Sequence, residues 1–320
     1  MGRRDTARSA SLTACAVALF AACANTPVRP PAQSPTAGDP ADDKLAQVLA
    51  HGKLVLPTDP AYPPASFSVD GATRPGTTKC AADELTGVEV DGYDVATSKL
   101  VAEALGLEPC FVTPPWNAQL AGHWGDRFDI AFSSIGITRS RMGQLYFTKP
   151  YYATPESFFV RDDAAAKEPE DLAGLRIGVC TGCFADLYLQ RKLDLPGAAV
   201  DYRVDDPVIV GYGIESAGLA DVAAGRLDAF LCQDTAGGQA IADGQSLRAI
   251  SPPAYVAFPA GALDRSSTLT LKPFFDRVNE ILAQGQQDGT LSTLSKKYFD
   301  HDYASAAADF DMAALGQVIE

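Results

Sequence analysis

Segments typical of strands and of helices alternate along this chain from residue 44 onward. This alternation favours an α/β architecture with mostly parallel sheets, because consecutive parallel strands need a crossover connection that is usually a helix. Roughly 280 residues follow residue 42, which is more than a single hydrophobic core usually organises. We therefore expect two domains, each with its own sheet and flanking helices.

The expected elements fall into two groups. The first group comprises a helix at 45–49, a strand at 53–57, a helix starting at Asp94 and ending at Gly106, a strand at 110–113, a helix from Trp116 and a strand at 128–132. The second comprises a strand at 175–180, helices at 185–193 and 213–225, a strand at 228–232, an extended run at 255–259, and helices at 272–286 and 291–299. Asp94 is expected to act as an N-cap, because its side chain can accept from the first free amides of a helix.

The N-terminus carries an export signal. Arg3, Arg4 and Arg8 precede an uncharged run at 9–22 that ends in small residues before Cys23, which is the pattern of a signal peptide. The run is too short to span a bilayer. Phe20-Ala21-Ala22-Cys23 resembles a bacterial lipobox, so we expect lipid on Cys23, with cleavage without lipid as the alternative.

These features divide the N-terminal region into a signal peptide at 1–22 and a lipid anchor with a flexible linker at 23–43. The linker is rich in proline, alanine and polar residues and has no apolar periodicity. We expect a protein that is exported to the periplasmic or extracytoplasmic face and that meets the membrane only through its N-terminal lipid.

The charge balance excludes one class of partner. The chain has 40 acidic and 26 basic residues, for a formal net charge of −14. A chain this acidic is repelled by phosphate backbones and by anionic membrane surfaces. Nucleic acid is therefore not an expected partner.

Seven cysteines suit an oxidising compartment, where disulfides persist. Five remain once Cys15 leaves with the signal peptide and Cys23 is assigned to lipid. We expect Cys80 to pair with Cys110, closing a loop of about 30 residues worth ~3 to 4 kcal/mol. The other pair joins Cys180 to either Cys183 or Cys232. Cys180-Thr181-Gly182-Cys183 has the spacing of a redox motif, but a structural disulfide is the preferred interpretation.

Several blocks of residues carry a resemblance to a known family. They are FDIAFSSIGITRSR at 128–141, YFTKPYY at 146–152, GKLV at 52–55, TDPAYPP at 58–64, GYDV at 92–95 and AAGRLDA at 223–229. With them, residues 45–302 resemble the extracellular solute-binding proteins for polar amino acids, family three, which feed ABC importers. The resemblance implies the type II periplasmic-binding-protein fold, an α/β fold with two lobes, each a mostly parallel sheet flanked by helices, and two hinge crossings.

The resemblance also places the domains and the function. Lobe 1 is expected at 44–156 plus 258–303, lobe 2 at 157–257 and a C-terminal tail at 304–320. The implied function is to bind a small carboxylate-bearing solute, an amino acid by preference, by hinge closure and to deliver it to an ABC permease. We expect a monomer without enzymatic activity, cofactor or metal, and His51, His123 and His301 are too widely spread for metal-ligand spacing.

Arg141 is the main candidate in the first lobe, because it stands at the family spacing. A guanidinium can hold a carboxylate through two parallel charge-assisted hydrogen bonds, which lysine cannot reproduce. The resemblance further implies that the rings of Tyr62 and Trp116 flank the solute and that Asp59 binds the polar end of the solute. The hydroxyls and backbone groups expected around Arg141 come from Ser133, Ser134, Gly136 and Thr138.

The second lobe departs from the family at two places. Where a glycine followed by serine or threonine is usual, this chain has Thr181, Gly182, Cys183 and Phe184. The aspartate expected to bind the solute's ammonium is displaced by one residue, which leaves Gln233 at the strict spacing and Asp234 beside it. If Asp234 faces the cleft, an amino acid is the ligand, which we favour. If Gln233 does, a carboxylate without an α-amino group becomes the better ligand.

Two other functions use the same scaffold. An exported enzyme resembling cyclohexadienyl dehydratase needs a buried carboxylic acid as general acid, and the sequence offers only Asp59 or Asp234 for that role. An accessory or sensor protein without a transport role is the third reading. Adjacent permease and ATPase genes would favour the importer.

Overall fold

The computed structural model describes residues 39–125 and 127–319. The predicted signal peptide, the lipidation at Cys23 and most of the linker lie outside these residues. Within the described ranges, none of the helices combines the length and the apolar character needed to cross a membrane.

The first group of elements is built around three small sheets. Strands β1 (Lys53–Pro57) and β6 (Glu108–Val112) are parallel, and α2 (Tyr93–Ala104) lies between them along the chain and packs on both. Helices α7 (Lys272–Gln287) and α8 (Thr290–Phe299) pack against α2 and against each other. The remaining elements are α1 (Lys44–His51), β2 (Ala61–Tyr62), β3 (Ser66–Ser68), β4 (Leu85–Thr86), β5 (Val90–Asp91), α3 (Trp116–Leu120), β7 (Leu145–Pro150) and β14 (Ala260–Asp264).

The second group is organised by one six-stranded sheet in the order β10-β9-β11-β8-β12, with β13 also pairing with β8. Strands β10, β9 and β11 are mutually parallel, whereas β8, at the next position, is antiparallel to β11. The elements are β8 (Thr154–Arg161), β9 (Arg176–Cys180), α4 (Phe184–Leu189), β10 (Val208–Tyr212), α5 (Glu215–Ala223), β11 (Ala229–Gln233), α6 (Asp234–Ala242), β12 (Leu247–Ala249) and β13 (Tyr255–Ala257).

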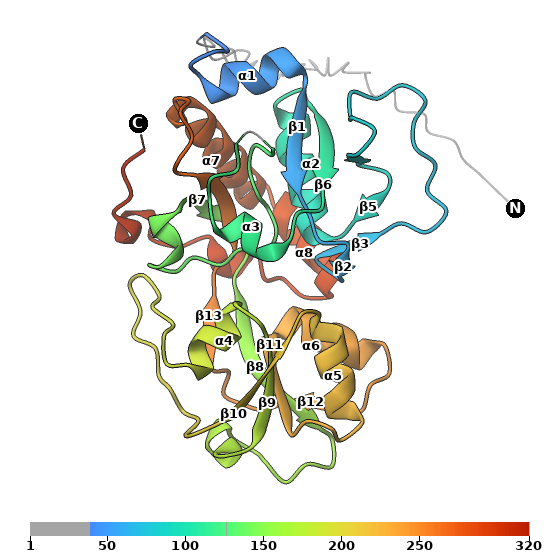
Figure 1. The fold of residues 1–320 in the computed structure, drawn as a ribbon, viewed down its shortest axis with the longest axis vertical. Helices are drawn as coiled ribbons and strands as arrows, with labels where there is room; N and C mark the ends of the chain where they lie inside the picture. Colours follow the sequence, from blue (N-terminus) through green and yellow to red (C-terminus); the bar gives the residue numbers. More distant parts are fainter. Residues whose placement is uncertain (1–38, 126, 320) are drawn as a thin grey trace, which may run out of the picture. The chain divides into compact units, whose positions relative to one another are not determined.

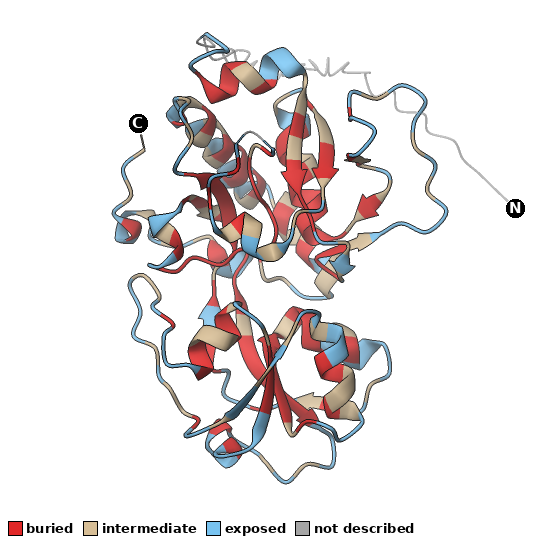
Figure 2. Ribbon diagram, viewed as in Figure 1, coloured by how far each residue is buried: buried red, intermediate tan, exposed pale blue. Residues whose placement is uncertain are grey.

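Each group has its own buried core, as the red segments of Figure 2 show. In the first, Leu54, Phe111 and Phe274 are fully buried; in the second, Phe158 and Leu231 are. Strands β8 and β13 run side by side where the chain passes between the groups (Figure 1), with Tyr255 opposite Glu156. The predicted lobe boundaries fall at these two strands and stay a prediction.

Most elements lie where the sequence pattern places them, but two predictions are wrong and one helix is shorter than expected. The stretch 128–132 is not a strand, because the Asp129 side chain accepts from the Val55 amide at 2.8 Å and only Ala131 forms a bridge, to Ala262. Asp94 is not the N-cap of α2. Gly92 holds that position at a φ of 126°, where a side chain would collide with the Ala65 carbonyl. Helix α4 also ends at Leu189, four residues before the predicted end.

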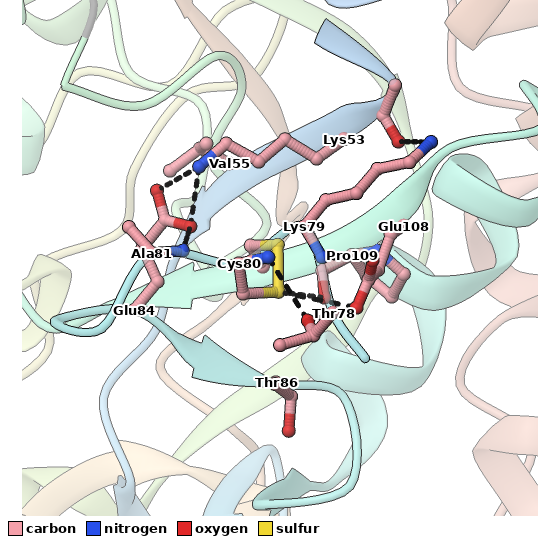
Figure 3. The surroundings of a disulfide bond; sticks show 12 residues. Lys53, Val55, Thr78, Lys79, Cys80, Ala81, Glu84, Thr86, Glu108 and Pro109 are labelled. Atoms are coloured by element: carbon pink, nitrogen blue, oxygen red, sulfur yellow. Dashed lines mark hydrogen bonds and ion pairs between the residues drawn. A yellow bond between two sulfur atoms is a disulfide. The ribbon is translucent and has the colours of Figure 1, made fainter. Parts of the chain in front are cut away.

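The expected disulfides are confirmed. Cys80 and Cys110 are joined with an S–S distance of 2.04 Å, tying an irregular loop to β6 (Figure 3). Cys180 pairs with Cys183. Cys232 is the free thiol among the described cysteines and is 1% exposed in the second sheet.

Candidate functional site

A cavity of about 90 Å³ lies at the carboxyl ends of β1, β9 and β11, which is where α/β sheets usually bind ligands. Residues of both groups of elements line it, so its walls come from segments far apart in the sequence. The lining residues are Thr58, Asp59, Ala61, Tyr62, Ser66, Asp94, Trp116, Ser133, Ser134, Gly136, Arg141, Glu156, Cys180, Cys183, Phe184, Ala185, Gly213, Ile214, Glu215 and Gln233.

Arg141 is the cation of this cavity. Its side chain is only 6% exposed, and it donates to the Gly136 carbonyl at 2.9 Å and to the Gly182 carbonyl at 3.4 Å. Among the described residues it forms no ion pair, and its burial lowers the guanidinium pKa to about 10. A buried guanidinium without an anion is costly, so the arrangement favours a negatively charged ligand group.

Two aromatic rings hold the Arg141 guanidinium in place. Its Cζ lies 4.5 Å from the ring centroid of Phe184 and 5.7 Å from that of Trp116. Phe184 reaches this position because Gly136 has no side chain. A Cβ on Gly136 would lie 2.2 Å from the Phe184 ring. The two groups of elements therefore meet at a contact that requires glycine.

Gly136→Ala should weaken ligand binding about tenfold or more, because the Phe184 ring must move away from Arg141 to admit the new methyl group. Isothermal titration calorimetry measures the affinity. The matched control is Gly238→Ala on α6, where a Cβ meets nothing within 4 Å and affinity should be unchanged. Equal affinities for the two variants would contradict this role of Gly136.

A hydrogen-bond network runs through the cavity floor from Asp94 to Gln233. Asp94 accepts from the hydroxyls of Tyr151 and Ser134, each at 2.7 Å. The Ser134 hydroxyl lies 2.8 Å from that of Tyr152, which donates to Gln233 Oε1 at 3.0 Å. This network connects residues of the first group to a side chain of the second sheet and fixes the rotamer of Gln233.

Three carboxyl groups that line the cavity were not predicted from the sequence: Asp94 and Glu156, which are buried, and Glu215, which is partly buried. Burial raises the pKa of Asp94 to about 7, against the opposing hydrogen bonds of Tyr151 and Ser134. Burial likewise raises the pKa of Glu215 to about 7. The pKa of Glu156 lies well above its usual range through burial and the nearby charges of Glu215 and Asp234. The cavity thus holds acidic groups whose ionisation depends on what binds beside them.

Glu156 and Gln233 are neighbours across two strands. They are directly opposite in the antiparallel pair β8–β11, and such partners place their side chains on one face of a sheet. Asp234, one residue further, is not among the lining residues. Its carboxyl group lies beside Ser157, with one oxygen buried and unpaired among the described residues. Burial raises the pKa of Asp234.

Ten of the predicted site residues line the cavity: Asp59, Tyr62, Trp116, Ser133, Ser134, Gly136, Arg141, Cys183, Phe184 and Gln233. Four do not. Thr138 accepts from the Arg141 amide and so positions Arg141, while Gly182 offers its carbonyl to the guanidinium. Thr181 is exposed, and the Asp234 carboxyl group lies beside Ser157. Solute contact by any of these fourteen residues stays a prediction.

Residues 54–301 match the family described as bacterial extracellular solute-binding proteins, family 3. The L-cystine-binding protein TcyJ of Escherichia coli is 27% identical over 261 residues, 81% of this chain and 86% of that protein. The L-arginine-binding protein of Pseudomonas aeruginosa is 29% identical over 188 residues, 58% of this chain and 67% of its own. The histidine-binding periplasmic protein of Salmonella typhimurium is 24% identical, covering 78% and 88%.

Solved structures share the fold. The amino acid ABC transporter substrate-binding protein AbpA from Streptococcus pneumoniae, bound to L-arginine, superposes with a TM-score of 0.64 at 19% identity, over 80% of this chain and 98% of that one. The ancestral amino acid-binding protein AncCDT-1, a precursor of cyclohexadienyl dehydratase, gives 0.64 at 22% identity, over 80% and 99%. The predicted two-lobe α/β fold is confirmed by these neighbours.

Proposed function

The chain belongs to the bacterial extracellular solute-binding proteins, family 3, and from this premise we propose that it binds an amino acid in its cavity and hands it to an ABC permease. Arg141 carries the proposal, because it is buried in the cavity wall and makes no ion pair among the described residues. A ligand carboxylate supplies the missing anion and can take two parallel hydrogen bonds from the guanidinium.

The ligand's ammonium is assigned to Glu156. The sequence suggested Asp234 for this charge, but Gln233 lines the cavity, and Glu156 is its direct partner on β8. Arg141 lowers the otherwise raised pKa of Glu156, which places the two charges within electrostatic reach of each other. The cavity therefore offers the Arg141 guanidinium for the ligand carboxylate and, in Glu156, a carboxyl group whose ionised form an adjacent ammonium would favour.

The side chain of the ligand is expected to extend past Tyr62 and Trp116 toward Asp59 and Glu215. One Glu215 oxygen and the indole nitrogen of Trp116 are buried without a hydrogen-bond partner among the described residues. Unpaired buried groups favour a ligand that satisfies them, here one with a polar or cationic end. The names of the relatives, which bind L-cystine, L-arginine and histidine, support such a ligand for this chain.

The rest of the proposal concerns location and partners. A signal peptide at 1–22 and a lipid on Cys23 would place the protein outside the cytoplasmic membrane, anchored by its N-terminus. The two predicted lobes are residues 44–156 plus 258–303 and residues 157–257. Their closure about β8 and β13 would bury the ligand and present a closed form to the permease. We expect a monomer.

A thermal-shift screen of common amino acids against their deaminated analogues tests the proposal. A ligand at about 100 times its dissociation constant adds ~2.7 kcal/mol of stability. We expect at least one amino acid to raise the melting temperature and its deaminated analogue to do so less. Stabilisation by deaminated acids alone would overturn the assignment of the ammonium, and no stabilisation by either set would overturn the amino-acid function.

Affinity for the amino acid should rise with pH. In the free protein, burial keeps the proton on Glu215 up to about pH 7, while a bound cationic group favours the ionised form. Binding then releases a proton, so affinity should be about tenfold higher at pH 8 than at pH 6. Calorimetry at the two pH values measures this, and the control is an analogue of the same amino acid whose side chain ends in an uncharged group. Weaker amino-acid binding at pH 8 would contradict the charge assignment.

A second candidate is an enzyme that dehydrates cyclic dienyl acids. The observation in its favour is the set of cavity-lining carboxyl groups with raised pKa, since a carboxyl that keeps its proton at neutral pH can act as a general acid. An assay decides between the binding protein and the enzyme: the protein is incubated with a cyclic dienyl carboxylate, and an aromatic product is detected by absorbance. We expect no turnover.

A further inference from the structure

The Cys180–Cys183 disulfide forms part of the cavity wall. Both cysteines line the cavity and both are partly exposed. The other disulfide differs, since Cys80 is 7% exposed and Cys110 is fully buried. A small molecule in the cavity can therefore reach the sulfur atoms of one disulfide and not those of the other.

Glu215 lies beside this disulfide. One of its carboxylate oxygens and the two Sγ atoms all lie within 4.8 Å of one another. The Glu215 pKa is raised to about 7 by burial, so the group exchanges a proton readily at neutral pH. A proton acceptor thus stands next to the only sulfur atoms that line the cavity among the described residues.

The ligand position is close to the same sulfur atoms. Gly182, between the two cysteines, has its carbonyl oxygen 3.4 Å from Arg141 Nη2. A carboxylate held by Arg141 therefore lies within one short side chain of the disulfide. A ligand that carries a thiol on that side chain would meet the S–S bond at close range.

Resting on the proposed amino-acid function, we propose that Cys180–Cys183 undergoes thiol–disulfide exchange with a small amino acid that carries a thiol and is held by Arg141. Glu215 accepts the proton of the ligand thiol. The ligand sulfur bonds to one Sγ, the Cys180–Cys183 bond breaks, and the other Sγ leaves as a thiolate that takes up the proton. The products are a mixed disulfide and one protein thiol, and no further oxidant is required.

A second ligand thiol completes the reaction. Its sulfur attacks the ligand sulfur of the mixed disulfide and releases the protein cysteine. The two ligands leave as one disulfide, oxidised by two electrons, and the protein keeps the two thiols of Cys180 and Cys183. The reverse reaction lets a ligand disulfide reoxidise the protein, so the site couples solute binding to the redox state of the solute.

The test is the reaction of the native, full-length protein with L-cysteine, followed by alkylation of free thiols and peptide mass spectrometry. Cysteamine, which has the same thiol and ammonium but no carboxylate, is the matched reagent. We expect the cysteinyl adduct on the Cys180–Cys183 peptide to form at least about tenfold faster than the cysteamine adduct, because Arg141 positions only the former. The Cys80–Cys110 peptide should stay unmodified.

Two controls keep the outcome decisive. Arg141→Ala should bring the L-cysteine rate down to that of cysteamine, and excess of a thiol-free amino acid from the thermal-shift screen should do the same with the unchanged protein. Equal rates for both reagents, or an intact Cys180–Cys183 bond, would overturn the inference. If thiol-free amino acids still raise the melting temperature, the proposed amino-acid function stands even when the exchange reaction is absent. If no thiol-free amino acid does so, the proposed function is wrong whatever the exchange experiment shows.

Discussion

Replacing Arg141 with alanine is expected to weaken amino-acid binding by about 3 to 5 kcal/mol, or roughly 10² to 5 × 10³-fold, because the ligand carboxylate then enters the cavity without a counter-charge. The side chain is 6% exposed and makes no ion pair within the described part of the chain, so no other residue takes over its role. Isothermal titration calorimetry with the amino acid from the screen measures the loss.

The matched control is Arg139→Ala. Arg139 lies two residues away, but its side chain is 55% exposed and pairs with Asp194 on the surface. An exposed pair of this kind contributes little, so affinity and stability should be close to those of the unchanged protein. Similar losses for both variants would show that Arg141 acts through the local fold and not through the ligand.

The double variant Cys80→Ser with Cys110→Ser should lose about 3 to 4 kcal/mol of unfolding free energy, because the bond closes a 30-residue loop. Around it, the Lys53 ammonium pairs with Glu84 at 2.7 Å and the Lys79 amide donates to Glu108 at 2.7 Å (Figure 3). These partly exposed contacts cannot replace the covalent link. Urea unfolding followed by circular dichroism measures the loss.

Removing the second disulfide provides the comparison. Cys180 and Cys183 are three residues apart, so the same chain-entropy model gives only about 1 to 2 kcal/mol for the variant Cys180→Ser with Cys183→Ser. The loss should therefore be about half that of the first pair. A larger loss for the second pair would contradict this account of how the two bonds stabilise the fold.

The predictable features are those that depend on local spacing. Arg141 stands in a contiguous block of the sequence, and Cys80–Cys110 is the preferred pair among the five cysteines left after export, which the structure confirms. Most helices likewise follow from apolar periodicity, whereas the order of the strands in each sheet does not. Where the 128–132 prediction fails, a side chain, Asp129, takes the hydrogen bond that a strand partner would make.

The missed features depend on packing between distant segments. Glu156 lies in an apolar strand, and only the register of β8 against β11 brings it beside Gln233. Glu215 begins a surface helix in the sequence pattern, and only the assembled cavity places it near Cys180 and Cys183. A charged residue within a buried strand is the one local signal that could have identified Glu156, because such a residue is rarely buried without a partner.

The most direct test of the central claim is a crystal structure of the complex with the amino acid from the screen. The account predicts that the ligand carboxylate accepts two hydrogen bonds from the Arg141 guanidinium and that its ammonium lies within hydrogen-bond distance of Glu156, with its side chain between Tyr62 and Trp116. A ligand whose carboxylate lies away from Arg141, or whose ammonium contacts Asp234 in place of Glu156, would contradict it.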